Sequence, residues 1–342
     1  MSNVTIVDIA KEANVSIATV SRVLNNNGRV SDKTKKRILD IIKKRGYVPS
    51  VAARALSSQH SRAIGVLIPN PTAYFFSRIL DGVSSVADKN NYVLIFCNTE
   101  NSPAKELNAI QMLANQHVAG LIITPAIDQE HQSENTALLE ALEELRIPVV
   151  FVDRKLNNAA GDAVLFNNYQ GAFIATEALI QSGCKNIGAI IPDQKLQLGI
   201  QRYRGYSDAI AQHHPSNPSD YTLTVDYSLS INDAYQLSKK LLKKLPKGSG
   251  VLLSNGTVSK GFLKALWETP LILGEDIVCV GFDKLELLDY MKINFNYVDR
   301  SEIEMGQLAA EMLLERINND LFISREYIIP AKLHAEFLGK TK

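Results

Sequence analysis

The most constraining feature of this chain is an alternation of apolar runs and helical stretches that begins after Arg62 and continues for about 230 residues. The apolar runs read AIGVLI, YVLIFC, GLIIT, PVVFV, NIGAII, GVLLS and IVCVGF. Strands that alternate with helices form parallel sheets with crossover helices. Because this many strands exceed one small sheet, we expect an α/β body of two doubly wound parallel-sheet lobes, divided near residue 162.

The first 62 residues differ from the body in charge. They hold twelve Lys or Arg and four acidic residues, a net charge of +8, whereas the whole chain carries only +1. The body is therefore mildly acidic, and the head is strongly basic. Such asymmetry predicts a polyanionic partner for the N-terminal end.

Three short helices are predicted in this basic head. A T-x-x-D pattern at Thr5 can cap the first helix, Ser16 can cap a second, and Ser31 begins a third that ends at Gly46. Two short helices joined by a tight turn form a helix-turn-helix. The sequence therefore predicts a small all-α DNA-binding headpiece over residues 1–48.

A linker and the body follow the headpiece. The linker, residues 49–62, contains SVAARAL, which is too short to be a stable helix in water unless something holds it. We therefore expect a hinge helix that orders only when bound. The body is predicted to span 63–342, with lobe one at about 63–162 and 295–320 and lobe two at about 163–294 and 321–338.

Several classes of protein are disfavoured by the sequence. No stretch of about 18 uncharged apolar residues occurs, so we expect a cytoplasmic protein with no membrane partner. Cys97, Cys184 and Cys279 are far apart in apolar runs, which predicts reduced core cysteines without a metal site or disulfide. Walker A, G-x-G-x-x-G, G-x-S-x-G and H-E-x-x-H motifs do not occur, so we expect neither a cofactor nor an enzyme.

The segment TIVDIAKEANVSIATVSRVLN, followed by GYVPS and VAARAL, resembles the head of LacI/GalR-type bacterial transcription regulators. The body continues the resemblance in the family's order with IGVLIP, HVAGLIIT, VDR, RYRGY, VGFD, EMGQLAAEMLLERI and YIIPAKL. The resemblance covers nearly the whole chain. It implies a homodimeric repressor that binds a pseudo-palindromic double-stranded DNA operator. A small carbohydrate effector would bind between two lobes like those of periplasmic binding proteins and change operator affinity.

The resemblance also assigns DNA contacts. Ile17, Ala18 and Arg22 occupy the family's base-reading positions, where an arginine suits guanine and small apolar side chains suit a thymine methyl. Phosphate contacts are expected from Thr5, Ser16, Thr19, Ser21, Asn25 and Thr34. Minor-groove contacts are expected from Ala53, Arg54 and Leu56, with the leucine as a wedge. The alternatives are hydroxyls that only cap helices and a leucine that only packs the linker.

The family's ligand positions fall at the carboxyl ends of predicted strands. They are Phe75, Phe76, Asp153, Arg154, Arg202, Asn255, Asp283 and Arg300. Charged groups would bind sugar hydroxyls, and aromatic rings would cover the apolar face of the sugar. The alternative is that the aspartates cap helices and the phenylalanines belong to the core.

Departures from the family pattern bear on the ligand. Gly256 replaces the usual aspartate of A-N-D, Tyr297 replaces a threonine, and Ala73 replaces a frequent asparagine. NSPAKELNAIQMLANQHVAG and SINDA are similar to Gram-positive ribose and sucrose operon repressors, so ribose is the first expectation, followed by sucrose or fructose. Arg300 stands where glutamine is common, and this extra cation keeps a sugar phosphate open unless it pairs with Asp299 or another acid. A protein co-regulator is a further candidate partner.

Two competing functions receive less support. A sugar hydrolase could use Asp153 and Asp283 as paired carboxylates, but flanking arginines would keep both ionised and unable to donate a proton. A periplasmic sugar-binding protein could use the same lobes, but the basic head and the lack of a signal segment disfavour it.

Overall fold

The fold was obtained as a computed structural model, and it describes most of the chain. The described residues are 4–24, 28–47, 61–128, 132–192, 195–213, 221–226, 229–319 and 323–335. Two compact units result, a headpiece within Met1–Ser61 and a core within Arg62–Lys342. Each unit is considered by itself. Across the described residues, no helix is long and apolar enough to cross a membrane.

The headpiece contains the three helices that the sequence predicts. They are α1 (Ile6–Glu12), α2 (Ile17–Leu24) and α3 (Asp32–Arg45). Thr5 and Asp8 form the capping box of α1, and Ser31 accepts a hydrogen bond from the Thr34 backbone N–H at the start of α3. Gly46 ends α3 in a left-handed conformation with φ 61°. The local capping signals therefore set the limits of these helices.

A small apolar core joins the three headpiece helices. Its buried members are Ile9, Ala10, Ala13, Val20, Val23 and Ile38. They come from all three helices and the turn after α1, and the basic residues lie outside this core. Glu12 of α1 also forms an ion pair of 2.7 Å with Arg45 of α3.

The core has two sheets, as predicted, and in the described residues each contains six strands. The first sheet has the order β11-β5-β4-β3-β1-β2, and all its pairings are parallel. The bounds in chain order are β1 (Ala63–Ile68), β2 (Val93–Asn98), β3 (Gly120–Ile123), β4 (Val149–Val152), β5 (Asp162–Phe166) and β11 (Glu326–Ile329). We call this sheet and its helices lobe one.

The second sheet, with its helices, forms lobe two and has the order β12-β10-β9-β8-β6-β7. Its strands are β6 (Ile187–Pro192), β7 (Thr222–Val225), β8 (Ser249–Leu253), β9 (Ile277–Phe282), β10 (Asn296–Asp299) and β12 (Lys332–His334). Only β12 runs antiparallel, beside β10, among the pairings in the described part of this sheet. The central strands are buried along their whole length, which explains their continuous apolar runs.

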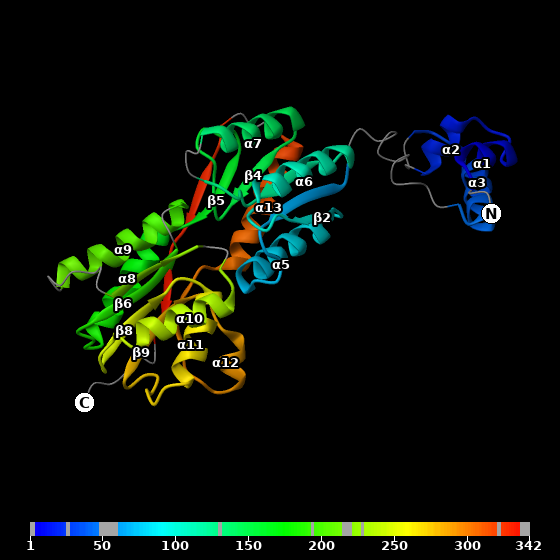
Figure 1. The fold of residues 1–342 in the computed structure, drawn as a ribbon. Helices are drawn as coiled ribbons and strands as arrows, with labels where there is room; N and C mark the ends of the chain where they lie inside the picture. Colours follow the sequence, from blue (N-terminus) through cyan, green and yellow to red (C-terminus); the bar gives the residue numbers. More distant parts are fainter. Residues whose placement is uncertain are drawn as a thin grey trace. The chain divides into compact units, whose positions relative to one another are not determined.

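Helices cover both faces of each sheet (Figure 1). In lobe one they are α5 (Tyr74–Lys89), α6 (Pro103–Asn115), α7 (Gln132–Leu145) and α13 (Glu302–Asn318). In lobe two they are α8 (Asn168–Gln181), α9 (Gln197–His213), α10 (Ile231–Leu242), α11 (Gly256–Trp267) and the short α12 (Glu286–Tyr290). The pairs α5 with α13, α8 with α9, and α10 with α11 make the most extensive helix contacts.

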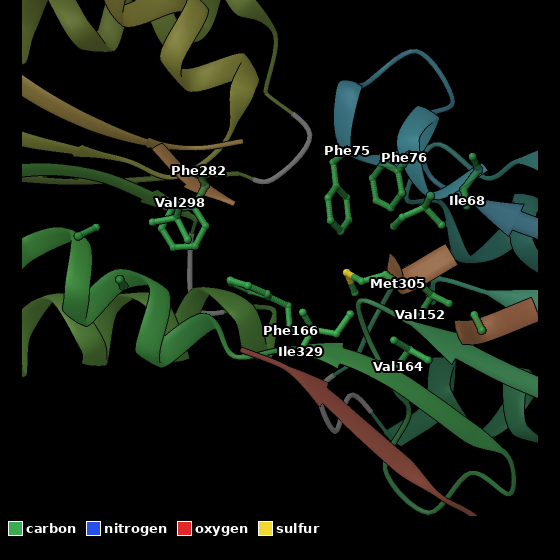
Figure 2. Packing of buried hydrophobic residues seen from close by; sticks show 14 of the residues in the cluster. Ile68, Phe75, Phe76, Val152, Val164, Phe166, Phe282, Val298, Met305 and Ile329 are labelled. Atoms are coloured by element: carbon green, nitrogen blue, oxygen red, sulfur yellow. The ribbon is translucent and has the colours of Figure 1, made fainter. Parts of the chain in front are cut away.

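One apolar cluster extends from lobe one into lobe two. Figure 2 shows Phe75 and Phe76 of α5 in this cluster, with Phe282 and Val298 at the strand ends of lobe two. Phe166 at the end of β5 makes an edge-to-face contact with Phe282, with ring centroids 6.4 Å apart. The lobes therefore share part of one core.

The lobe boundaries differ from the predicted ones at three places. Strand β5 belongs to lobe one, so the chain first crosses at Asn167 and not near 162. Strand β10 belongs to lobe two although 295–320 was predicted for lobe one, and β11 belongs to lobe one although 321–338 was predicted for lobe two. Strand β11 pairs with β5, and β10 pairs with β9 and β12, so these pairings decide which lobe each strand belongs to. The apolar run of a strand does not reveal which other strand it will pair with.

A buried carboxylate fixes the edge of lobe one at β5 and β11. Asp162 accepts hydrogen bonds from Arg316 of α13 at 2.6 Å and from Arg325, just before β11, at 2.7 Å. Although burial raises the pKa of Asp162, these arginine hydrogen bonds outweigh burial and lower it to about 2. The ion pairs hold the start of β5 against the segment that returns from α13.

The contact between α5 and α13 requires two glycines. A Cβ at Gly82 would lie 2.2 Å from the carbonyl oxygen of Ile303, and one at Gly306 would lie 2.1 Å from that of Ile79. Both obstacles are backbone atoms of the facing helix, which cannot rotate away. The two helices can therefore approach this closely only with hydrogen at both positions.

We expect Gly306→Ala to destabilise the core by about 2–3 kcal/mol, as overpacking of a close helix contact does. Thermal or urea unfolding of the full chain measures this loss. The matched control is Glu311→Ala at an exposed position of the same helix, which should change stability by less than about 0.5 kcal/mol. Equal stability of the Gly306→Ala variant and the parent would show that α5 and α13 separate easily.

Candidate functional site

The headpiece exposes one face of α2. Ile17, Ala18 and Arg22 are exposed, whereas Val20 and Val23 on the opposite side are buried in the headpiece core. The three predicted base-reading side chains therefore share a surface. Ile17 is 47% exposed, so its apolar side chain is accessible on this surface.

The predicted phosphate-binding hydroxyls lie at or near helix N-termini. Thr5 caps α1, the Ser16 hydroxyl accepts from the Thr19 backbone N–H at 3.2 Å, and Thr34 lies 2.8 Å from Ser31. Helix N-termini carry free N–H groups and a positive dipole, which suit phosphate oxygens. Capping and phosphate contact are compatible at these positions. Ser21 is half-buried on α2, and Asn25, Ala53, Arg54 and Leu56 lie outside the described residues.

The core holds a cleft of about 840 Å³ at the carboxyl ends of strands from both lobes. Lobe one contributes Pro69, Asn70, Ala73, Tyr74, Phe75, Phe76, Asn98, Glu100 and Asn101. Lobe two contributes Leu229, Asn255, Gly256, Thr257, Lys260, Leu263, Trp267, Asp283, Lys284, Leu285, Glu286, Leu287 and Leu288, and Arg300 lies where the chain crosses between lobes. Aromatic rings, amides and charges in a cleft of this size suit a small polyhydroxyl ligand.

A buried ion-pair network lies behind this wall. Arg300 donates from Nε to Oδ1 of Asp283 at 2.7 Å, and its Nη2 lies 2.5 Å from the same oxygen. Its Nη1 lies 3.6 Å from Oδ1 of Asp153 in lobe one. Arg300 thus connects carboxylates from the ends of β4 and β9. The predicted alternative partner, Asp299, instead binds the backbone N–H of Ser301.

Both aspartates of this network have unusual backbone conformations. Asp153 has φ 66° and Asp283 has φ 74°, in the left-handed region that few residues other than glycine adopt. Each follows the last residue of a buried strand, so the strained turn directs a carboxylate into the space between the lobes. Such strain is typical of functional positions.

Two other predicted ligand residues are held within the protein. Arg154 donates from Nη1 to the Asn101 side chain at 2.8 Å and to the carbonyl oxygen of Pro125 at 3.0 Å. Arg202 donates to the Asn168 side chain at 2.8 Å and to the carbonyl oxygen of Ser254, with its guanidinium 4.0 Å from the Phe282 ring centroid. Neither arginine lines the cleft in this arrangement.

The remaining predicted residues border the cleft, but the phenylalanines also belong to the core. Phe75 and Phe76 are 3% exposed and make an edge-to-face pair. Asn255 is half-buried, and its side chain accepts from the Val258 backbone N–H at 2.8 Å, which caps α11. A ligand at Asn255 would therefore also meet the N-terminus of α11.

Sequence reasoning missed a contact between the lobes. Asp128, which follows β3 in lobe one, accepts a hydrogen bond of 2.9 Å from the backbone N–H of Gln197 at the start of α9. Burial raises the pKa of this carboxyl. No motif marks Asp128, because its partner is a backbone group that any residue could provide.

Glu106 of α6 is a buried acid near this contact. It accepts from the backbone N–H of Ala126 at 3.1 Å, and Arg154 donates to the carbonyl oxygen of the same residue. Burial raises the pKa of Glu106 to about 7.

Burial and the charge of Asp283 likewise raise the pKa of Glu302, beside the Arg300 network, to about 7. In the described residues no group of His, Cys, Asp and Glu could hold a metal ion.

Family models match both units of the chain. The model for bacterial regulatory proteins of the lacI family matches residues 5–50. The model for periplasmic binding proteins and the sugar binding domain of the LacI family matches residues 61–339. The chain belongs to the LacI family. It is therefore a DNA-binding transcription regulator with a helix-turn-helix headpiece and a periplasmic-binding-protein-like core.

Similar proteins agree with the family assignment. A ribose operon repressor from Halalkalibacterium halodurans is 31% identical over 331 residues, which cover 96% of this chain and 95% of that protein. The transcriptional repressor PurR from Histophilus somni strain 2336 is 30% identical, with 92% of each chain covered. These relatives are transcriptional repressors.

Solved structures give the same two-unit architecture. The Lac repressor dimer bound to operator and the anti-inducer ONPF has a TM-score of 0.84 at 22% identity, covering 99% of this chain and all of that chain. A LacI family transcriptional regulator from Enterococcus faecium with bound ribose has a TM-score of 0.69 at 26% identity, covering 81% and 98%. The LacI-family fold thus extends over the head and the body.

The raised pKa of Glu106 predicts a pH-dependent stability. Between pH 4.5, which is the usual pKa, and about pH 7, the folded protein keeps Glu106 protonated and the unfolded chain does not. The stabilisation that the protonated carboxyl contributes is therefore complete below pH 4.5 and is lost as the pH rises to 7. Glu106→Gln keeps an acceptor for the Ala126 N–H without a charge. We expect this variant to be more stable than the parent at pH 8, by up to about 3 kcal/mol, and equally stable near pH 4.5.

Thermal unfolding of the full chain between pH 4.5 and 8 measures this difference. Glu143→Gln on the exposed surface of α7 is the matched control and should show no pH-dependent gain. A Glu106→Gln variant that is less stable than the parent at pH 8 would contradict a protonated, buried Glu106.

Proposed function

We propose that this LacI-family chain represses a sugar-utilisation operon and that a small sugar in the core cleft changes its affinity for operator DNA. The function is a binding equilibrium without catalysis. The observation that carries the proposal is the cleft, where side chains from the strand ends of both lobes meet. A ligand there touches both lobes and can favour one of their arrangements.

The chemistry of the cleft supports a sugar. Tyr74 and Trp267 offer ring surface for the apolar face of a sugar, the buried Phe75 and Phe76 lie behind them, and Asn98, Asn101 and Asn255 offer amides for its hydroxyls. Arg300 is balanced by Asp283 and Asp153, so its charge does not favour a sugar phosphate. An uncharged sugar fits this balance better.

Ribose is our first proposal for the ligand, with sucrose or fructose next. The similarity to a ribose operon repressor over nearly the whole chain supports ribose, as does the fold shared with a family member that has bound ribose. The eight residues predicted for ligand binding remain the proposed set, with Asp153, Arg154 and Arg202 acting from behind the wall of the cleft and Arg300 acting through its bond to Asp283.

On the DNA side, we propose that α2 enters the major groove, with Ile17, Ala18 and Arg22 toward the bases. Their shared exposure and the charge of the head support this role. Ser16, Thr19 and other hydroxyls at the helix N-termini would hold phosphates. The hinge with Leu56 remains a prediction from the sequence, as a minor-groove wedge.

A homodimer completes the proposal, because a pseudo-palindromic operator requires a twofold partner. Exposed apolar side chains on lobe one and lobe two support self-association. They include Val93, Phe96, Met112, Tyr290 and Met291. The edge strand β2, which carries Val93 and Phe96, is an unusual place for such residues unless another chain covers it.

A thermal-shift screen of the full chain tests the sensor role. We expect D-ribose, or else D-fructose or sucrose, to raise the melting temperature, because a ligand that binds only the folded protein stabilises it. At a concentration about 100 times the dissociation constant the stabilisation is about 2.7 kcal/mol. L-Arabinose and inorganic phosphate serve as controls.

The outcomes separate the proposed ligand classes. A shift with one free sugar identifies the effector. Shifts with phosphorylated sugars alone would replace the neutral-sugar proposal with a sugar-phosphate sensor. No shift with any sugar or sugar phosphate would contradict a sugar-sensing cleft.

A further inference from the structure

The carboxylate of Asp283 is already occupied by groups of the protein. Its Oδ1 accepts from Arg300, and its Oδ2 accepts from the backbone N–H of Gly256 at 3.3 Å. Its side chain is 5% exposed although it lies at the wall of the cleft. A sugar hydroxyl that approaches Asp283 therefore has to compete with a guanidinium group.

A second carboxylate lies on the other side of Arg300. Asp153 of lobe one is 3.6 Å from Nη1 of Arg300 and 3.7 Å from Nε of Arg154, and its side chain is fully buried. Within the described part of the chain, neither of its carboxylate oxygens accepts a hydrogen bond. Arg300 is thus hydrogen-bonded to the aspartate of lobe two and close to an aspartate of lobe one that still has acceptor capacity.

Phe75 covers the guanidinium group. The centroid of its ring lies 3.3 Å from the Cζ atom of Arg300, and both residues border the cleft. A planar guanidinium group can slide along an aromatic face with little loss of the cation–π interaction. Because Nη1 of Arg300 already lies 3.6 Å from Oδ1 of Asp153, a second position of the guanidinium group is within reach.

The backbone at Arg300 is a crossing between the lobes. Arg300 follows β10 of lobe two and precedes α13 of lobe one, and Ser301 between them has φ 48°. If Arg300 changed its acceptor, its ion pair with Asp283 of lobe two would be replaced by one with Asp153 of lobe one. Such an exchange is a two-state element that can couple the cleft to lobe position.

We propose that Arg300 determines ligand specificity by competing for Asp283: an uncharged sugar takes the Asp283 carboxylate, and the guanidinium of Arg300 moves to Asp153. This inference rests on the proposed sugar-sensing function. Its ligand class is a neutral polyol, because Asp153 and Asp283 balance Arg154 and Arg300 before and after the move. An anionic group would instead bind the guanidinium directly.

Arg300→Gln removes the competitor. Isothermal titration of the full chain with D-ribose, D-fructose and sucrose should then give a dissociation constant about tenfold lower than in the parent, the effect of losing one charge-assisted competing bond. If Arg300 instead donates directly to the ligand, the same variant binds the sugar more weakly. The sign of the change therefore distinguishes the two roles.

Asp153→Asn removes the second acceptor and leaves Arg300 on Asp283. We expect its dissociation constant to rise about tenfold in the parent background and to stay unchanged in the Arg300→Gln background, because the effect acts through Arg300. An equal loss in both backgrounds would show that Asp153 touches the sugar itself and would overturn the proposed transfer.

Two further variants keep the test decisive. Arg316→Gln breaks a comparable buried ion pair with Asp162, far along α13 from the cleft, and should lower the melting temperature without changing sugar affinity. Arg300→Lys retains the positive charge between the aspartates but lacks the planar fork, so it should fold even where Arg300→Gln does not and should bind sugar about threefold more tightly. If the folded Arg300 variants bind sugar as tightly as the parent or more weakly, the competition by Arg300 is overturned. Binding of a sugar by the parent still upholds the proposed sugar-sensing function. If the parent binds none of the three sugars, both fail.

Discussion

The arrangement of the core depends on one buried cation held between two strand ends. Arg300 is 1% exposed, so its charge requires carboxylate partners within the protein, and Asp283 and Asp153 supply them from different lobes. The left-handed backbone at both aspartates turns their side chains toward it. This network lies against Phe75, within the apolar cluster that the two lobes share.

Polar contacts extend from this network to the helices of lobe two. Arg154, next to Asp153, donates hydrogen bonds to the carbonyl oxygens of Pro125 and Ala126. Two residues after Ala126, the carboxylate of Asp128 in lobe one accepts a hydrogen bond from the backbone N–H of Gln197 at the start of α9 in lobe two. Hydrogen bonds and the intervening residues 125–128 thus connect the end of β4 with the start of α9. A ligand that changes which arginine pairs with Asp153 would therefore act on a continuous chain of contacts that reaches lobe two.

The sequence allowed the headpiece helices, the two parallel sheets and the cleft to be predicted, because caps such as Thr5 and Ser31 and the buried strands are local signals. The lobe crossings could not be predicted, because the pairing of β10 and β11 depends on strands distant in the sequence. The sequence predicted Arg202 at the end of a strand, but Arg202 lies within α9, and its bonds to Asn168 and Ser254 arise only from packing. The contact made by Asp128 had no sequence signal.

We propose that ligand binding in the cleft is coupled to DNA binding by the headpiece. The most direct test of this coupling is fluorescence anisotropy of the full chain on a duplex that the protein selects from a random library, with and without the sugar that raises its melting temperature. We predict that saturating sugar changes the dissociation constant for this duplex at least about fivefold and leaves that for a shuffled duplex unchanged. The same dissociation constant with and without bound sugar would contradict this coupling.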